Sequence, residues 1–372
     1  MRSLVICPND FHLFYDSCIA SGSTELHGHP IHFALIERPR PTFDPLKQAD
    51  YVMVQKNAFS CNYRDIAYIL HAQQKINESA NEVKFRPIGS EFCGVVVETG
   101  NNVKHLKQGD RVIPNAFYPS PNPNVAPGVA TNSASNEYEV FHADKLVSIP
   151  SEMPDEVGAA FTIGAQTAYA MADRLQINEH GRILITGINS NTSLFVLNTL
   201  LGLGFTKISG ICRNEQLIPR IKALGLSNIF VVPSDSKDNL VDIPEIREDI
   251  IQHGRFDYVI DPFADSNMLK CLSVLAMNGK YIYCGMSDQV RFTQQVINSS
   301  HFQHILTANI SIIGNCLGSS EHLEKSIKLF EQQKLTVVLD EVITNDITRF
   351  IERSFLARDK FGKVVFKYTG QS

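Results

Sequence analysis

RILITGINSNTSLFVLNTLLGLG, residues 182–204, joins three patterns: a continuous apolar run, a polar turn and a second apolar run with helical spacing. A strand buried on both faces carries polar residues only at its ends, whereas a helix repeats its apolar residues every three or four positions. The stretch therefore predicts a strand, a tight turn and a helix. Its turn, GINSNTS (187–193), contains only one glycine, Gly187.

The same alternation of strand and helix patterns continues after this stretch. KISGICR (207–213) predicts a second buried strand, and NIFVVP, FDYVIDPF and GKYIYCG predict three more. Strands of this kind, joined through helices, form parallel sheets covered on both faces. We therefore expect residues 156–315 to form a doubly wound α/β domain.

The residues on either side of this domain have a different pattern. Short strand patterns separated by turn signals, such as FCGVVVETG (92–100) and DRVIP (110–114), predict a β-rich domain over residues 1–155. The chain ends with another strand pattern, FGKVVFKY (361–368), which we expect to return to the first domain's sheet. The doubly wound domain would then be inserted within a split β-rich domain, with residues 316–372 completing the latter.

Composition excludes several classes of function. The 372 residues carry a formal net charge of −5 and no long basic run, so they provide no attractive field for nucleic acid or anionic lipid. No stretch approaches the roughly 20 apolar residues that a membrane span needs. The eight cysteines are dispersed, and several lie in apolar strand patterns, which is typical of reduced thiols. We expect a cytoplasmic globular protein that binds neither nucleic acid nor membrane.

Several stretches, in order along the chain, resemble the medium-chain dehydrogenase/reductase superfamily. GSEFCGVVVETGNNVKHLKQGDRV (89–112) carries the G-x-E-x-x-G and G-D-R-V motifs of that superfamily at the same spacing. Further agreement comes from NYRD (62–65), FTIGAQTAYAM (161–171), FDYVIDPF (256–263) and FGKVVFKY. The resemblance covers nearly the whole chain, and it implies a GroES-like catalytic domain with an inserted Rossmann domain.

Many members of this superfamily are zinc alcohol dehydrogenases. The positions of their catalytic zinc ligands correspond here to Asn62, Ser90 and Ile163 or Gly164, none of which offers a thiolate, imidazole or carboxylate. Cys61 lies one residue too early and, on a strand, would point away from the side that Asn62 faces. The sequence therefore predicts no catalytic or structural zinc. It is similar to the zinc-independent branch of quinone oxidoreductases, 2-enal reductases and enoyl-thioester reductases.

The polar turn has the chemistry of a phosphate-binding loop despite its single glycine. Backbone amides at a helix N-terminus bind phosphate, and Ser, Thr and Asn side chains can donate further hydrogen bonds. The turn resembles the loop of mitochondrial-type enoyl-thioester reductases. The candidate cofactor-binding residues of the turn are Gly187, Asn189, Ser190, Asn191, Thr192 and Ser193. The alternative is a Rossmann domain whose cofactor site has decayed.

The end of the second Rossmann strand favours NADPH over NADH. An NAD site usually places Asp or Glu there to bind the ribose 2′-hydroxyl, whereas an NADP site places a cation there to bind the 2′-phosphate. Arg213 occupies this position, and Asn214 follows it. A charge-assisted hydrogen bond of about 1.5–3 kcal/mol would favour NADPH by roughly one to two orders of magnitude. A merely solvated arginine is the alternative.

The resemblance assigns roles to a few more residues. Asn62, the Asn of N-x-x-D, would orient the nicotinamide, and Thr167 and Gly285 would lie near the cofactor. Mitochondrial-type relatives use a tyrosine shortly after N-x-x-D as the proton donor, which makes Tyr63 and Tyr68 the candidates. Packing or turn formation is the alternative role for each of these residues, and solvent is the alternative proton donor.

Without a Lewis acid an alcohol is hard to deprotonate, whereas an activated C=C bond accepts hydride at its β-carbon more readily. The resemblance therefore implies an NADPH-dependent reductase of an enoyl thioester in lipid or polyketide biosynthesis, such as a trans-acting polyketide enoyl reductase. Its substrate would be a small-molecule or carrier-bound acyl group, with an acyl carrier protein as candidate partner and a homodimer as candidate assembly. A quinone or 2-enal reductase is the enzymatic alternative. A non-redox binding protein with a decayed cofactor site is the alternative of another class.

Overall fold

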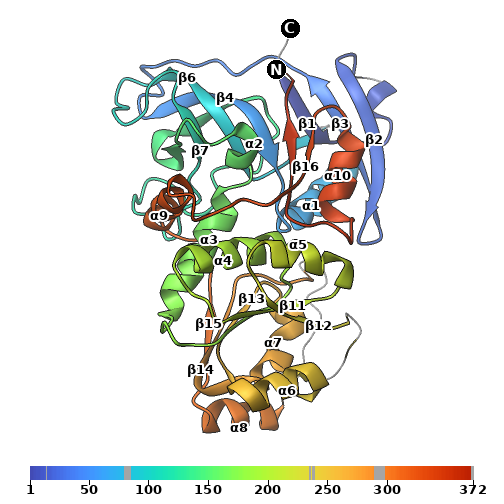
Figure 1. Cartoon of the computed structure of the whole chain (residues 1–372). Coiled ribbons are helices and arrows are strands. Elements are labelled where there is room, and N and C mark those ends of the chain that lie inside the picture. The colour runs from blue at the N-terminus through green and yellow to red at the C-terminus, as the bar shows by residue number, and fades with distance from the viewer. Residues whose placement is uncertain (14, 79–84, 234–235, 237–238, 289–297, 370–372) are drawn as a thin grey trace. The chain divides into compact units, whose positions relative to one another are not determined.

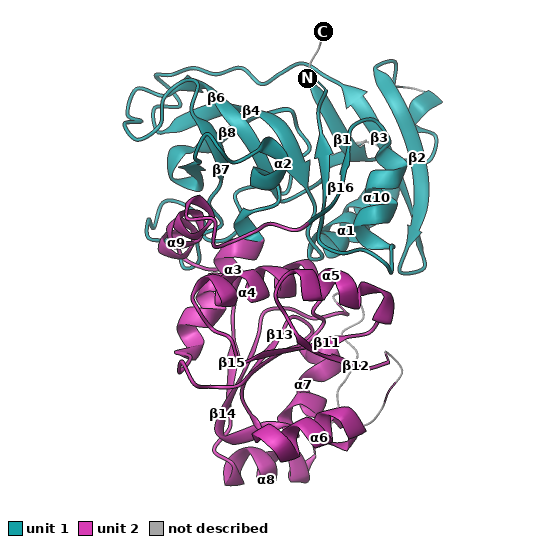
Figure 2. Ribbon diagram, in the orientation of Figure 1, with its two compact units in different colours: residues 1–163, 339–372 teal, residues 164–338 magenta. Residues whose placement is uncertain are grey.

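The computed structural model describes residues 1–13, 15–78, 85–233, 236, 239–288 and 298–369 (Figure 1). The chain divides into two compact units (Figure 2). Unit 1 consists of residues 1–163 and 339–372, and unit 2 of residues 164–338. The second unit is thus inserted within the first, which confirms the predicted split of the β-rich domain. No helix of the described residues is long and apolar enough to cross a lipid bilayer.

The described residues of unit 1 form two β-sheets. The smaller sheet has the strand order β2 (Cys18–Leu26), β3 (His29–Glu37), β1 (Arg2–Ile6) and β5 (Arg86–Pro87). The larger sheet has the order β16 (Leu339–Ile343), β17 (Lys363–Lys367), β4 (Tyr51–Ser60), β6 (Glu91–Thr99), β7 (Arg111–Pro114) and β9 (Leu146–Ser148), and β8 (Tyr138–His142) also pairs with β4. Because β17 pairs antiparallel with β4, the last strand returns to the sheet of the first domain, as predicted.

Short helices complete unit 1. They are α1 (Asp65–Glu78), α2 (Asp155–Gly158) and α10 (Ile347–Phe355), with 3₁₀ turns η1 (Phe11–Leu13) and η2 (Ala143–Lys145). Helix α10 is strongly amphipathic and packs its apolar side, which includes Phe350, against β17 and β2. The ring centroids of Phe350 and Phe59 lie 5.2 Å apart.

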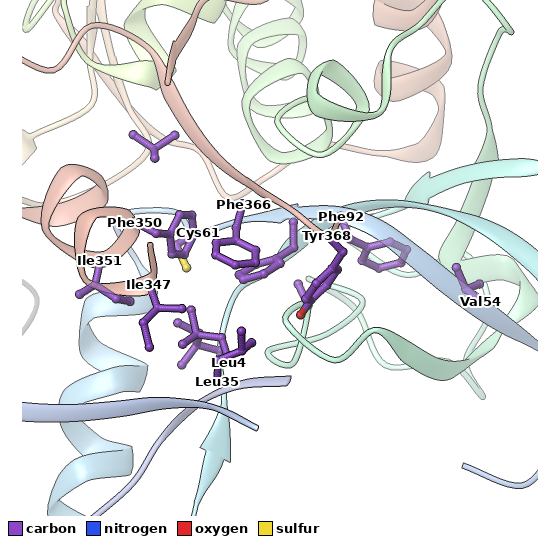
Figure 3. Packing of buried hydrophobic residues seen from close by; sticks show 14 of the residues in the cluster. Leu4, Leu35, Val54, Cys61, Phe92, Ile347, Phe350, Ile351, Phe366 and Tyr368 are labelled. Atoms are coloured by element: carbon purple, nitrogen blue, oxygen red, sulfur yellow. The ribbon is translucent and has the colours of Figure 1, made fainter. Parts of the chain in front are cut away.

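Alternation along β4 and β17 separates an apolar face of the larger sheet from a polar one. Phe59 pairs with Phe366, and both belong to the hydrophobic core. Figure 3 labels Phe366 and Cys61 of this core. Burying an aromatic side chain of this size contributes about 1.5–3 kcal/mol. Since successive side chains of a strand point to opposite faces, Lys363 and Lys367 lie on the face away from Phe366. The apolar face fixes the register, and the opposite face is left to carry polar residues.

The described residues of unit 2 form a parallel sheet in the order β12 (Asn228–Val231), β11 (Ile208–Cys212), β10 (Ile183–Ile185), β13 (Phe256–Asp261), β14 (Leu275–Tyr283) and β15 (Ser311–Gly314). Its helices are α3 (Thr162–Leu175), α4 (Asn191–Gly202), α5 (Ile218–Ala223), α6 (Pro244–His253), α7 (Ala264–Leu272), α8 (Ser299–Thr307) and α9 (Ser320–Glu331), with 3₁₀ turns η3 (Glu215–Leu217) and η4 (Leu240–Asp242). Numbered along the chain, the strands have the order 3-2-1-4-5-6 of the doubly wound dinucleotide-binding fold. The predicted parallel sheet is confirmed.

The unit boundaries differ from the expected ones at residues 155 and 315. Unit 1 continues to Ile163, because the amide of Ile163 donates a hydrogen bond to the Glu91 carboxylate at 2.5 Å. Unit 2 continues to Val338, because α9 packs against α4, and the hydroxyl of Ser326 donates to the carbonyl of Ala165 at 3.2 Å. Helix α9, which we expected in the β-rich domain, therefore belongs to the compact unit of the parallel sheet.

Candidate functional site

The polar turn between β10 and α4 forms with a single glycine. Gly187 has a φ of +50°, a conformation that suits glycine, and the amide of Ser190 donates to the Gly187 carbonyl at 2.8 Å. Ser190 is the N-cap of α4, and its hydroxyl accepts a hydrogen bond from the amide of Ser193 at 3.2 Å. Ser190 therefore caps the start of α4 at a position where a glycine-rich dinucleotide-binding loop usually has a glycine.

The turn leaves backbone donors available at the start of α4. Among the described residues, the amides of Asn191 and Thr192 have no hydrogen-bond acceptor, and both residues are partly exposed, as is Asn189. The N-terminus of a helix concentrates such amides and the positive end of the helix dipole. The chain thus keeps the donors that bind a phosphate group at a helix N-terminus.

Ser193 has a different place from the other residues of the turn. Its side chain is buried, and its hydroxyl donates to the carbonyl of Thr186 at 2.8 Å. This bond ties the first turn of α4 to the end of β10, where the glycine-rich loop would have a glycine for close helix–strand packing. A cofactor contact of Ser193 stays a prediction.

A buried aspartate, Asp261, holds the strand ends around this turn. Its carboxylate accepts hydrogen bonds from the hydroxyl of Thr186 at 2.5 Å and from the hydroxyl of Tyr281 at 2.6 Å. It also accepts from the amide of Phe263 at 2.9 Å and from the side chain of Asn267 at 3.0 Å. One fully buried carboxylate thereby fixes β10, β13, β14 and the start of α7 to one another. This role of the Asp in FDYVIDPF was not predicted from the sequence.

A pocket opens in unit 2 at the ends of β10, β11 and β12. Its lining residues are Thr186, Gly187, Ile211, Arg213, Val232, Pro233, Leu240, Asn267, Lys270 and Cys271. Among the residues that the structure describes, this lining contains two cationic side chains and no carboxylate. The sequence predicted that Arg213 faces the cofactor. It gave no prediction for Lys270. Lys270 lies on α7, and only the placement of β13 beside β10 brings that helix to the pocket.

Unit 1 contains a second group of polar residues, here called the polar cluster: Asn62, Asp65, Ser90, Glu91 and Lys363. The ammonium of Lys363 donates to the Asn62 side-chain oxygen at 2.6 Å and to the Glu91 carboxylate at 2.5 Å. The Asn62 side-chain nitrogen donates to Glu91 at 2.7 Å and to the Ser90 hydroxyl at 3.1 Å. All members except Asn62 are buried, and Asn62 is partly exposed.

These contacts fix the orientation of the Asn62 amide. Its oxygen must face the ammonium of Lys363 and its nitrogen must face the Glu91 carboxylate, because an ammonium only donates and a carboxylate only accepts. Both N–H bonds of the amide donate within the cluster, and one lone pair of its oxygen accepts from Lys363. Only the second lone pair of the oxygen is left to form a further hydrogen bond. Toward a ligand, Asn62 can therefore act only as an acceptor. Asn62 was predicted from the sequence, whereas its partners Lys363 and Glu91 were not.

Asn62 and Ser90 stand at two of the positions where zinc alcohol dehydrogenases have metal ligands, and their side chains are hydrogen-bonded to each other. Within the described ranges, no three His, Cys, Asp or Glu side chains are grouped so that they could hold a metal ion. The positive charge beside Asn62 is the ammonium of Lys363. Cys61, which directly precedes Asn62, is buried in the apolar core.

Asp65 anchors the polar cluster at the start of α1. Its carboxylate accepts from the amide of Asn62 at 2.8 Å and from the hydroxyl of Ser90 at 2.7 Å, and Arg64 pairs with it at 2.7 Å. Burial raises the pKa of the Asp65 carboxyl, and the charge of Arg64 and these hydrogen bonds oppose the rise. Asp65 thus fixes the local backbone and binds Arg64.

The remaining candidates lie in two places. Tyr63 is exposed, and Tyr68 lies partly buried on α1, where burial raises the pKa of its phenol and makes it a weaker acid than an ordinary tyrosine.

In unit 2, Thr167 is buried on α3, and Gly285 follows β14, where a β-carbon would lie 2.8 Å from the Pro262 carbonyl. Gly285 is therefore required for packing, and the cofactor roles of both residues stay predictions.

A lysine near the polar cluster provides a pH-dependent prediction. Burial, with the like charge of Lys363 as the second cause, lowers the pKa of Lys360 from 10.5 to about 8. Below pH 8 the folded state bears the cost of this desolvated, partly buried charge, and the cost disappears as the pH rises from 8 to 10.5. We expect Lys360→Met to be more stable than the wild type at pH 7, with a difference that shrinks over that interval. Urea unfolding at several pH values measures it, and a constant difference would contradict the assignment.

Comparison with known proteins gives the following matches. Residues 48–151 match the alcohol dehydrogenase GroES-like domain. An acryloyl-coenzyme A reductase of Sulfurisphaera tokodaii is 21% identical over 339 residues, which cover 87% of this chain and 94% of that protein. An uncharacterized zinc-type alcohol dehydrogenase-like protein of Escherichia coli is 22% identical over 299 residues, covering 76% and 81%. A 2-octenoyl-CoA carboxylase reductase, solved in complex with NADP and 2-octenoyl-CoA, superposes with a TM-score of 0.73 at 19% identity over 100% of this chain and 88% of that one.

Proposed function

We propose that this chain, which belongs to the medium-chain dehydrogenase/reductase superfamily, is an NADPH-dependent, zinc-independent reductase of an activated C=C bond. The observation that carries the proposal is the pocket of unit 2, whose described lining residues include the cations Arg213 and Lys270 and no carboxylate. A site for the uncharged ribose 2′-hydroxyl of NADH usually offers an acid, whereas a 2′-phosphate requires cations.

The residues around the polar turn fit the rest of a dinucleotide. The free amides of Asn191 and Thr192 suit a pyrophosphate, and Gly187 lines the same pocket as the two cations. Ser190 and Ser193 hold the turn itself. We assign the pyrophosphate to the start of α4 and the 2′-phosphate to Arg213 and Lys270.

Unit 1 would contribute the polar cluster to the reaction. Bound NADPH would supply a hydride for the β-carbon of the substrate. Asn62 would accept a hydrogen bond from an N–H or O–H group, because its oxygen keeps one lone pair, and Lys363 would hold it in that orientation. The proton for the α-carbon would come from Tyr63, Tyr68 or solvent.

An enoyl thioester is the substrate class that we favour. Asn62 and Ser90 place an amide and a hydroxyl at two of the positions where zinc alcohol dehydrogenases have their metal ligands. Neither is a usual zinc ligand, so these positions would not hold the Lewis acid that alcohol oxidation needs. Two of the matched proteins carry enoyl-CoA compounds in their names. The acyl group would be bound to coenzyme A or to an acyl carrier protein.

Calorimetric titration with NADPH and with NADH tests the cofactor assignment, because the chain contains no tryptophan for quenching measurements. We expect saturable NADPH binding and NADH binding weaker by roughly tenfold to hundredfold, the ratio that one charge-assisted contact provides. Equal affinity for both nucleotides would overturn the choice of NADPH. Absence of binding by either would favour a non-redox protein with a decayed site.

Turnover separates the reductase classes. We expect NADPH oxidation, followed by the nicotinamide absorbance, with a short enoyl-CoA thioester, and we expect no change when a chelator is added. Faster turnover with the same acyl group on a carrier protein would identify the carrier as the partner. Turnover with a quinone or 2-enal but not with thioesters would replace this proposal by the quinone or enal reductase alternative.

A further inference from the structure

Unit 1 contains a cavity of about 650 Å³ that the proposed reaction does not use. Its volume lies within the range of about 300–1,000 Å³ that is common for small-molecule sites. The cationic residues in its wall are Arg2, Arg38, Arg40, Lys56 and Lys367, against the carboxylates Glu137 and Asp155. The wall is therefore strongly polar, with an excess of cationic residues.

Both carboxylates of the wall already have cationic partners. Glu137 accepts from the guanidinium of Arg2 at 2.9 Å and from the Arg2 amide at 2.8 Å. Asp155 accepts from Arg111 at 2.7 Å and from the side chain of Asn57 at 2.9 Å. The negative charge of the cavity is thus neutralised within the protein.

Two arginines retain their charge for a ligand. No carboxylate of the described residues pairs with Arg38, whose guanidinium lies 5.7 Å from the ring centroid of Phe85. Arg40 reaches Glu98 at 3.5 Å, and both of these side chains are exposed, by 60% and 36%. Exposed pairs of this kind contribute little energy, so Arg40 is easily recruited by a competing anion. Lys56, in contrast, is buried against Glu139 and offers no free charge.

The local sequence holds these two arginines in a restricted conformation. They belong to Arg38-Pro39-Arg40-Pro41, in which each arginine precedes a proline. Proline fixes its own φ and confines the preceding residue to an extended conformation. Less backbone entropy is then lost when the segment that carries the two guanidinium groups binds a ligand. Their planar, multiply donating groups match the geometry of phosphate.

We propose that this cavity binds a phosphorylated small molecule with at least two negative charges, held by Arg38 and Arg40. The site is separate from the polar cluster, because Lys367 of the cavity and Lys363 of the cluster are four residues apart on β17, a distance of about 13 Å. It is also formed entirely by unit 1, whereas the proposed nucleotide pocket lies in unit 2. Inorganic polyphosphates and nucleoside polyphosphates share the required chemistry.

Calorimetry with tripolyphosphate and with ATP tests this site on the full chain, in the presence and absence of excess NADPH to account for binding in unit 2. We expect saturable binding of one equivalent that persists with NADPH and weakens as salt is added. Arg38→Ala combined with Arg40→Ala is expected to weaken it at least tenfold, roughly the loss of one charge-assisted contact. Tighter binding of ATP would identify a nucleoside polyphosphate, and equal affinities would identify the phosphates alone as the recognised group.

The matched control is Arg358→Ala, which removes an exposed arginine of the same unit outside the cavity. We expect this control to bind as the wild type does, and circular dichroism to report the same fold for all variants. Absence of saturable binding by the wild type, or unchanged binding by the double variant, would overturn the proposal. So would an equal loss in the control. Because Arg213 and Lys270 of the proposed NADPH site are untouched, failure here leaves the proposed reductase function standing.

Discussion

Replacing Lys363 by methionine is expected to lower the free energy of unfolding by about 3–5 kcal/mol. The Lys363 and Glu91 side chains are exposed by only 3% and 0%, and their charged atoms lie 2.5 Å apart. Methionine keeps much of the side-chain volume but removes the ammonium, which leaves the Glu91 carboxylate buried beside the Asn62 amide without its cation. Urea unfolding monitored by circular dichroism measures the difference.

The same strand supplies the matched control. Lys367 lies on the same face of β17 and pairs with Glu156 at 2.9 Å, but the two side chains are exposed by 39% and 28%. Lys367→Met should therefore cost no more than about 1 kcal/mol. Adding Glu91→Gln to Lys363→Met should recover part of the lost stability, because it removes the uncompensated charge. Equal losses for the two lysine variants would show that the buried pair has no special role.

Much of the fold could be predicted from the sequence because its signals are local and physical. The continuous apolar run of RILIT indicates a strand buried on both faces, and the parallel strand β10 in the middle of the sheet meets that expectation. FGKVVFKY indicated a returning strand, and β17 pairs with β4. Helix α9 was assigned to the other domain, because an amphipathic pattern tells that one face is covered but not by which partner.

The candidate site was only partly predictable, for a related reason. Arg213 was found because it directly follows a strand whose end faces the cofactor in this fold. Lys270 lies in the last turn of α7, and it reaches the same pocket only through the order of the strands. Lys363 and Glu91 are separated by 272 positions in the chain, so no pattern within a short window connects them.

Combining Arg213→Ala with Lys270→Ala is expected to weaken NADPH binding by roughly 10²–10⁴-fold, since each charge-assisted contact with the 2′-phosphate is worth about 1.5–3 kcal/mol. NADH affinity should change little, because NADH lacks that phosphate. Each single variant should lose less NADPH affinity than the double variant. A loss in Lys270→Ala would indicate two contacts with the 2′-phosphate, whereas unchanged NADPH affinity in this variant would indicate that Arg213 alone binds it.

Calorimetry of the wild type, the two single variants and the double variant with both nucleotides measures these differences. Lys270 also donates to the carbonyl of Ser236 at 2.5 Å, so a purely structural role would weaken NADPH and NADH alike. Loss confined to NADPH would therefore come from the 2′-phosphate. Lys222→Ala, on α5 outside the pocket, is the matched control and should leave both affinities unchanged. If the double variant bound NADPH as tightly as the wild type, the pocket of unit 2 would not hold the 2′-phosphate, and the preference for NADPH would lose its basis.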